Sequence, residues 1–138
     1  MKKLLVLILL LYLTACSRPA VNLSIEEAWA RPGMAGGNSA VYFVIENLGM
    51  PDNLLAASSD VAKAVELHET VMEGDQMKMK HLHQVPIPAG EKTHFQPGGL
   101  HVMLIGLQRD LKVGDTFELT LTFQQAGDQT ITVTVQQP

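Results

Sequence analysis

Two histidines and two methionines lie within one stretch of the chain: His68, Met79, His101 and Met103. Ten residues separate His68 from Met79, twenty-one separate Met79 from His101, and one separates His101 from Met103. Imidazole binds copper or zinc, soft thioether sulfur selects Cu(I), and hard cations prefer carboxylates. The four side chains therefore predict a Cu(I) site that holds one ion per chain.

The elements around these residues must bring them to one place. His101 and Met103 are two residues apart on an expected strand, so their side chains should share a face. His68 and Met79 fall on two strands joined by a turn near Gly74. A two-residue loop at 73–74 would set His68 across from Met79, and a four-residue loop would set it across from His81, with Met79 on the diagonal. Either loop keeps His68 and Met79 on one face.

The same stretch contains a second pair of candidate ligands, His81 and His83. Because imidazole also suits Cu(II), this pair predicts a secondary metal site; the alternative is a solvated strand face.

Cysteine is restricted to one position, Cys16. A disulfide within the chain is therefore excluded, and so are a blue-copper site with a thiolate ligand and structural zinc sites built on several cysteines.

The N-terminus has the pattern of an export signal. Lys2 and Lys3 precede an apolar run at 4–13 that is too short to span a bilayer, and 13–16 reads Leu-Thr-Ala-Cys. This pattern resembles a bacterial lipoprotein signal, which implies cleavage of 1–15 and lipidation of Cys16, with 16–20 as a short tether. An ordinary secretory peptide is the alternative. Several acyl chains on one cysteine would anchor the protein stably to a membrane.

The remaining chain is acidic. Without Lys2 and Lys3, 8 of the 10 basic residues remain against 14 acidic ones, so the net charge is about −6 with neutral histidines. This sign disfavours nucleic acid as a partner, because nucleic-acid binding needs a basic surface.

Residues 21–138 have the patterns of a single all-β domain. Apolar and polar residues alternate at 117–123 and 131–135, an apolar β-branched run covers 39–45, and 86–90 reads as a loop between strands. Without any sustained helical period, these segments predict an antiparallel β-sandwich of seven to nine strands.

The H-x10-M-x21-H-x-M spacing and its surroundings resemble the periplasmic copper chaperone family that serves the copper A centre of cytochrome c oxidase. The matching segments are AWARP at 28–32, AVYFVIEN at 40–47, VELHETVMEGDQMKMK at 65–80, IPAGE at 87–91 and PGGLHVMLIGL at 97–107. The resemblance implies a cupredoxin-like Greek-key sandwich without the cupredoxin cysteine. It also implies a non-enzymatic carrier, which holds one Cu(I) with the two His and two Met and passes it to a partner. His81, His83 and the lipoprotein signal depart from the family pattern.

The expected partners are copper, a membrane reached through the lipid anchor, and an acceptor such as cytochrome c oxidase subunit II or another copper chaperone. We expect an exported monomer at the periplasmic face of a bacterial membrane, which Ser17 would assign to the outer membrane of a Gram-negative cell. Three alternatives remain open: a copper buffer or resistance lipoprotein with the same ligands, a zinc hydrolase with Glu66 or Glu69 as base, and a purely structural sandwich.

Overall fold

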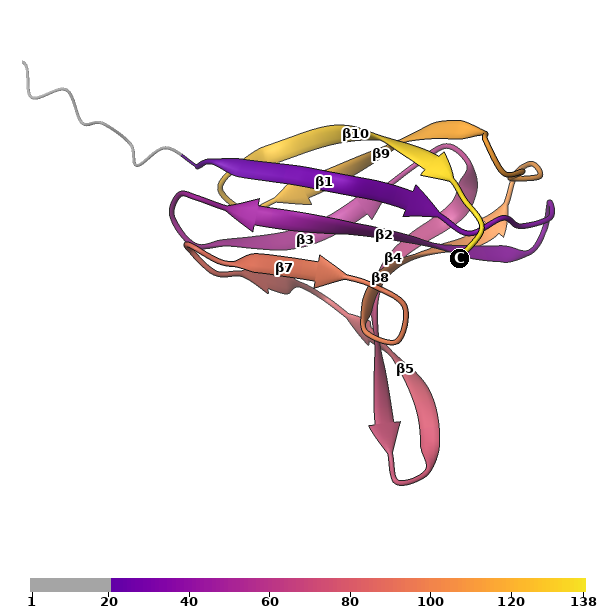
Figure 1. The fold of residues 1–138 in the computed structure, drawn as a ribbon, viewed down its shortest axis with the longest axis horizontal. Coiled ribbons are helices and arrows are strands. Elements are labelled where there is room, and N and C mark those ends of the chain that lie inside the picture. Colours follow the sequence, from indigo (N-terminus) through magenta and orange to yellow (C-terminus); the bar gives the residue numbers. More distant parts are fainter. Residues whose placement is uncertain (1–20) are drawn as a thin grey trace, which may run out of the picture.

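A computed structural model describes residues 21–138, so the expected signal, Cys16 and the tether lie outside the described residues. These residues form ten β-strands (Figure 1). The strands are β1 Leu23–Ala30, β2 Asn38–Asn47, β3 Asp52–Ser58, β4 Ala62–Glu73, β5 Gln76–Leu82, β6 Val85–Ile87, β7 Lys92–Phe95, β8 Leu100–Leu107, β9 Thr116–Phe123 and β10 Gly127–Val135. Within 21–138 there is no helix of the length and apolar character that crossing a membrane requires.

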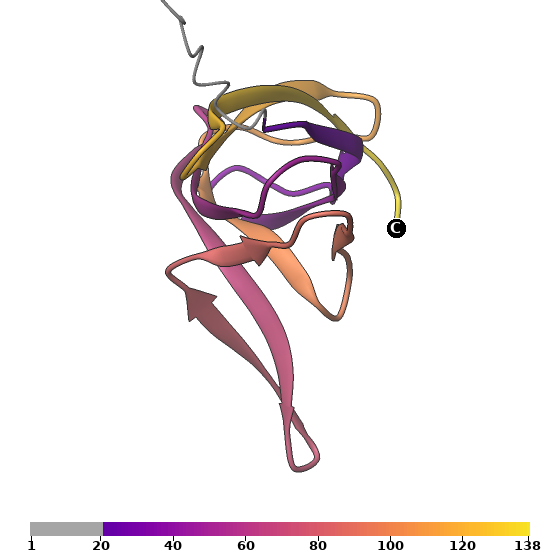
Figure 2. The ribbon, with the colours of Figure 1, turned by 90° about the vertical axis from the view of Figure 1, so that its left-hand side faces the viewer.

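The strands form one continuous hydrogen-bonded sheet in the order β5-β4-β8-β7-β2-β1-β10-β9-β3-β6. Strand β2 pairs with β8 along 38–41 and with β7 along 43–46, which brings β8 close to the centre of the sheet. Most neighbours are antiparallel, whereas β1–β10 and β7–β8 are parallel. Figure 2 shows the strands of the body curving around a common interior, which holds a single core.

The core confirms the alternation seen in the sequence. Phe117, Leu119, Leu121 and Phe123 of β9 are buried, while the residues between them are exposed or half-buried. On β8, Val102 and Leu104 are fully buried in the same core. Because side chains alternate along a strand, His101 and Met103 must project from the opposite face of β8.

The β4–β5 hairpin extends beyond the body of the sheet as an arm (Figures 1 and 2). Its turn consists of Gly74 and Asp75, because Glu73 pairs with Gln76. Gly74 has φ 63°, the left-handed conformation that a two-residue hairpin turn places on glycine at its first central position. This turn fixes the register of the whole arm.

The all-β prediction is confirmed, with ten strands where seven to nine were expected. The additional strand is β6, which overlaps the segment at 86–90 interpreted as a loop. Its central residue, Pro86, has no N–H to donate, which normally argues against a strand. β6 is the last strand of the sheet, and proline is tolerated on an edge strand because only one side needs hydrogen bonds.

A buried carboxylate ties the start of β3 to the turn between β9 and β10. Asp52 is 4% exposed. One of its oxygens accepts hydrogen bonds from the backbone N–H groups of Asn53 (2.7 Å) and Gln125 (2.8 Å), and the other accepts one from Ala126 (2.9 Å). Three donors in a buried site satisfy the carboxylate and fix the turn.

Replacing Asp52 with alanine should lower the free energy of unfolding by about 2–3 kcal/mol, because three backbone N–H groups lose a charged acceptor. Urea denaturation followed by circular dichroism measures this. Asp60→Ala, at an exposed aspartate between β3 and β4, is the matched control and should change stability by less than about 0.5 kcal/mol. Equal effects of the two substitutions would contradict the proposed role of Asp52.

Candidate metal centre

The pairing of β4 with β8 brings two histidines together. His68 lies directly opposite His101 in the antiparallel register, and their ring centroids are 5.8 Å apart. Met103 lies opposite Glu66, two residues before His68, on the same face. Three of the four predicted ligands are therefore neighbours on one face of two adjacent strands.

The arm brings the fourth residue to the same face. His68 pairs with His81, and Met79 pairs with Thr70, so Met79 lies on the diagonal from His68. This is the second of the two registers considered from the sequence, although it is produced by a two-residue turn at Gly74 and Asp75. Met79 is 61% exposed, whereas His101 is 3% exposed. The candidate site thus extends from a buried imidazole to a thioether in contact with solvent.

A hollow of about 440 Å³ lies between the arm and the body of the sheet. Met79, His101 and Met103 line it, together with Met77 and Tyr42. His68 is not among the residues that line it. Sulfur and nitrogen donors therefore share an open hollow that an ion can reach from solvent.

The hydrogen bonding of His101 leaves one ring nitrogen free. Its Nδ1 lies 3.0 Å from the carbonyl oxygen of Gly99. Because a carbonyl only accepts, Nδ1 must carry the proton, and Nε2 keeps its lone pair. Nε2 is buried and has no hydrogen-bond partner in residues 21–138. A buried, unpaired acceptor is costly in a folded protein, and metal coordination would satisfy it.

His68 has the same arrangement with the two nitrogens exchanged. Its Nε2 donates to a carboxylate oxygen of Glu66 at 2.8 Å, which leaves Nδ1 with the lone pair. This Nδ1 is the other buried side-chain atom without a partner among the described residues. Metal-binding histidines usually donate their second N–H to a carboxylate or a carbonyl, which orients the ring and fixes the tautomer. His68 donates to a carboxylate and His101 donates to a carbonyl.

Histidine, cysteine and carboxylate ligands do not gather in threes in the described part of the chain: no three His, Cys, Asp or Glu side chains within 21–138 lie close enough to hold a metal ion by themselves. A site at His68 and His101 must therefore be completed by other donors, and the thioethers of Met79 and Met103 are the donors at hand. This mixed set favours a soft ion over zinc or a hard cation.

Comparison with known proteins gives the family. A family model described as LpqE-like lipoproteins matches residues 23–135. The chain belongs to the LpqE-like family. Lipoprotein Lxx21020 of Leifsonia xyli subsp. xyli is 30% identical to this LpqE-like chain over 120 residues, or 86% of the chain and 72% of the relative. Uncharacterized protein RP573 of Rickettsia prowazekii is 31% identical over 115 residues, and the match spans 79% of the chain and 64% of that protein.

Solved structures place the LpqE-like fold among PCuAC domains. The copper-bound PCuAC domain from PmoF2 has a TM-score of 0.71 and 27% identity, over 88% of this chain and 99% of that domain. The solution structure of CuI-DR1885 from Deinococcus radiodurans has a TM-score of 0.64 and 28% identity, over 88% and 83% of the two chains. The family resemblance and the cupredoxin-like fold predicted from the sequence are thereby confirmed.

Two residues of the LpqE-like site were not predicted in their structural roles. The ring of Tyr42 lies at a tilt to the rings of Trp29 and His101, with centroids 4.7 Å and 6.4 Å away. Burial raises the pKa of Tyr42 above its ordinary value and outweighs the opposing effect of the nearby Arg31 guanidinium, so the phenol stays neutral beside the imidazole. Tyr42 lies between Val41 and Phe43 on one strand, so its side chain projects from the face opposite to theirs. This alternation is the sequence signal that could have placed Tyr42 on the site face.

Glu66 is the second of these residues, since from the sequence it was considered only as the base of a hydrolase. Its spacing of two residues from His68 on one strand is the signal for its role as hydrogen-bond partner. The pKa of Glu66 lies below the ordinary value of 4.5, chiefly because His68 donates a hydrogen bond to the ionised form. The carboxylate therefore stays ionised, and orients His68, to a lower pH than an ordinary glutamate would.

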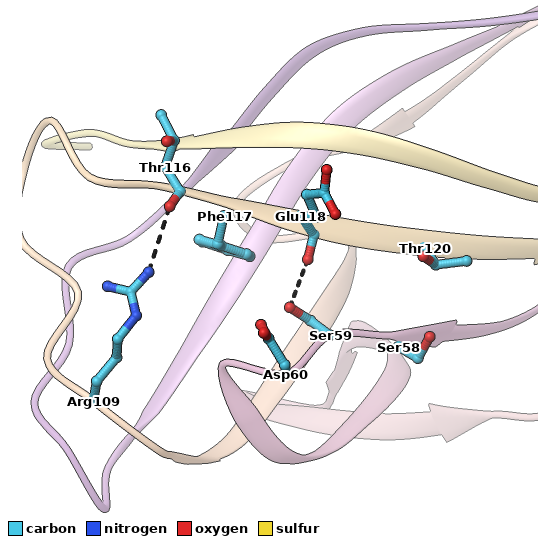
Figure 3. A pocket seen from close by; sticks show the side chains of 8 residues that line it. All are labelled: Ser58, Ser59, Asp60, Arg109, Thr116, Phe117, Glu118 and Thr120. Atoms are coloured by element: carbon cyan, nitrogen blue, oxygen red, sulfur yellow. Dashed lines mark hydrogen bonds between the residues drawn. The ribbon is translucent and has the colours of Figure 1, made fainter.

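A larger hollow of about 520 Å³ lies elsewhere, between the β3–β4 turn and β9 (Figure 3). Its polar side chains tie the walls together: Ser59 donates to the Glu118 carbonyl at 2.6 Å, and Arg109 donates to the Thr116 carbonyl at 3.4 Å. Arg109 also contacts the carboxylate of Asp115 at 3.5 Å. These bonds join loop to strand, and the larger hollow has none of the predicted ligands.

The hydrogen bond between Glu66 and His68 can be tested by titration. Carbon-detected NMR of the Glu66 carboxyl group should give a midpoint below 4.5 in the metal-free protein. In His68→Ala the midpoint should rise toward 4.5, because the largest stabilisation of the carboxylate is lost. His94→Ala, at an exposed histidine on β7, should leave it unchanged. An unchanged midpoint in His68→Ala would show that the bond is absent in solution.

Proposed function

We propose that this LpqE-like protein is an extracytoplasmic copper carrier, which binds one Cu(I) through His68, Met79, His101 and Met103 and passes it to an acceptor protein. The observation that carries the proposal is the pair of buried nitrogens, His68 Nδ1 and His101 Nε2, which share one sheet face with two thioethers and have no partner in residues 21–138. The printed descriptions of two structural neighbours, a copper-bound PCuAC domain and CuI-DR1885, support copper as the ion.

The ligand set suits a carrier because it can bind Cu(I) and still release it to an acceptor. Thioether and neutral imidazole add no negative charge, so the site lacks the stabilisation that thiolates give to Cu(I). An acceptor with cysteine thiolates can then remove the ion by exchanging one ligand at a time. Met79 is the most exposed of the four and lies on the arm, so we propose that it is displaced first.

The same geometry orients the two imidazoles for an incoming ion. Glu66 and the Gly99 carbonyl hold the two imidazoles in the tautomers that present their lone pairs. Ligands oriented in advance lose little conformational freedom on binding. The two histidines are oriented in advance, whereas Met79 on the arm is the ligand that we expect to exchange first.

We further propose that the protein acts outside the cytoplasm, attached through lipidated Cys16 to a bacterial membrane. The LpqE-like family description and the name of the Leifsonia relative, both of which refer to lipoproteins, support the anchor. Cytochrome c oxidase is the proposed final recipient, directly or through another chaperone. Within 21–138 no group of three His, Cys, Asp or Glu side chains supports the zinc-hydrolase alternative.

Anaerobic titration with less than one equivalent of Cu(I), followed by X-ray absorption at the copper edge, should give a site with both nitrogen and sulfur ligands. Met103→Leu should fold normally, since the two side chains have similar volume, and should lose at least ~10-fold in Cu(I) affinity. Met50→Leu, at an exposed methionine before β3, is the matched control and should bind like wild type. A copper site without sulfur, or undiminished affinity in Met103→Leu, would refute the ligand set.

Deletion of the gene separates delivery from buffering. If the protein delivers copper, the deletion strain should lose cytochrome c oxidase activity, and added copper should partly restore it. A copper buffer predicts the reverse, which is normal oxidase activity with greater sensitivity to copper. Complementation with Met103→Leu should fail in the first case, whereas complementation with Met50→Leu should succeed.

A further inference from the structure

Four imidazoles form a continuous row across one end of the sheet. The ring centroids are 5.3 Å apart for His83 and His81, 5.6 Å for His81 and His68, and 5.8 Å for His68 and His101. The last three lie opposite one another on β5, β4 and β8, in successive cross-strand pairs. The strand register therefore sets these three, and His83 follows in the connection between β5 and β6.

Exposure falls along this row from one end to the other. His83 and His81 are exposed, the side chain of His68 is 14% exposed, and His101 is buried. The two inner histidines carry the unpaired nitrogens described above. A path of imidazole ligands thus leads from solvent to the buried end of the candidate centre.

We propose that His81 and His83 form an outer copper position, from which Cu(I) passes through His68 to the inner centre and returns on release. This rests on the proposed function, because the inner centre must itself bind Cu(I). The inner four residues alone would account for a carrier; the outer pair adds a second binding position and a route.

The spacing of the outer pair suits a single ion. Metal–imidazole bonds are about 2.0–2.1 Å, so two nitrogens on one ion lie no more than about 4 Å apart. Rings with centroids 5.3 Å apart reach this separation by side-chain rotation, and both residues are exposed and free to rotate. Since no third His, Cys, Asp or Glu within 21–138 completes a cluster there, the outer pair should bind more weakly than the inner centre.

Passage along the row needs only ligand exchange. A copper–nitrogen bond to His68 Nδ1 forms as the bond to His83 breaks, and a bond to His101 Nε2 forms as the bond to His81 breaks. Copper remains Cu(I) throughout, so no electron donor or acceptor is required, and neutral imidazoles release no proton. The carboxyl group of Glu66 lies 2.8 Å from His68 Nε2, and negative charge beside the row favours a cation there.

The test is an anaerobic Cu(I) titration of the wild-type protein, the double variant His81→Ala/His83→Ala and the control His94→Ala. Wild type and the control should bind two equivalents, the second more weakly. The double variant should bind one, with first-site affinity within about twofold of wild type. In wild type, the second equivalent should shift the ring ¹H–¹⁵N signals of His81 and His83.

The route is tested by stopped-flow transfer of one bound Cu(I) to bathocuproine disulfonate. The double variant should transfer roughly tenfold more slowly than wild type and His94→Ala, a barrier increase of about 1.4 kcal/mol. A second equivalent that survives in the double variant, or an unchanged transfer rate, overturns the proposal. A wild-type protein that binds no Cu(I) would instead refute the proposed function itself.

Discussion

The candidate centre depends on the hydrogen-bonded register of three neighbouring strands. Because β5, β4 and β8 pair so that His81, His68 and His101 lie opposite one another, every other member of the site takes its place from that alignment. A shift of one residue on β4 would turn His68 into the core and bring Leu67 to the site face. The core therefore protects the site, since such a shift would expose Leu67, which is buried, and bury a polar ring.

The two imidazoles show how a fold can orient candidate ligands for a soft metal without a cysteine. Each ring is held through one nitrogen, by a backbone carbonyl in one case and by a carboxylate in the other, and its second nitrogen has no partner within 21–138. Each buried nitrogen without a partner lowers the free energy of unfolding, and the packing of the surrounding strands offsets this cost. The thioethers differ in their surroundings, because Met103 is half-buried on a central strand and Met79 is exposed on an edge strand.

The sequence predicted the fold class and the shared face of the four residues, because a period of two is a local signal. The family followed from the resemblance of the ligand motif and its surrounding segments. The pairing of His68 with His81 could not be chosen in advance, since it depends on whether the turn closes at 73–74 or 74–75, and both positions include Gly74. β6 was missed because Pro86 is acceptable only at a sheet edge, and edge position follows from the whole topology. The tautomers of His68 and His101 likewise require distances to Glu66 and Gly99.

The arm has a consequence for solubility. β5 is the outermost strand at one end of the sheet, and it exposes Met77 and Met79, a combination that ordinarily invites another chain to add a strand. Lys78 and Lys80 alternate with these methionines and point to the other face, and Lys78 pairs with Glu73 across the hairpin. Charge on an edge strand opposes self-association. The arm can thus expose its thioethers to solvent while other copies of the chain are kept from extending the sheet.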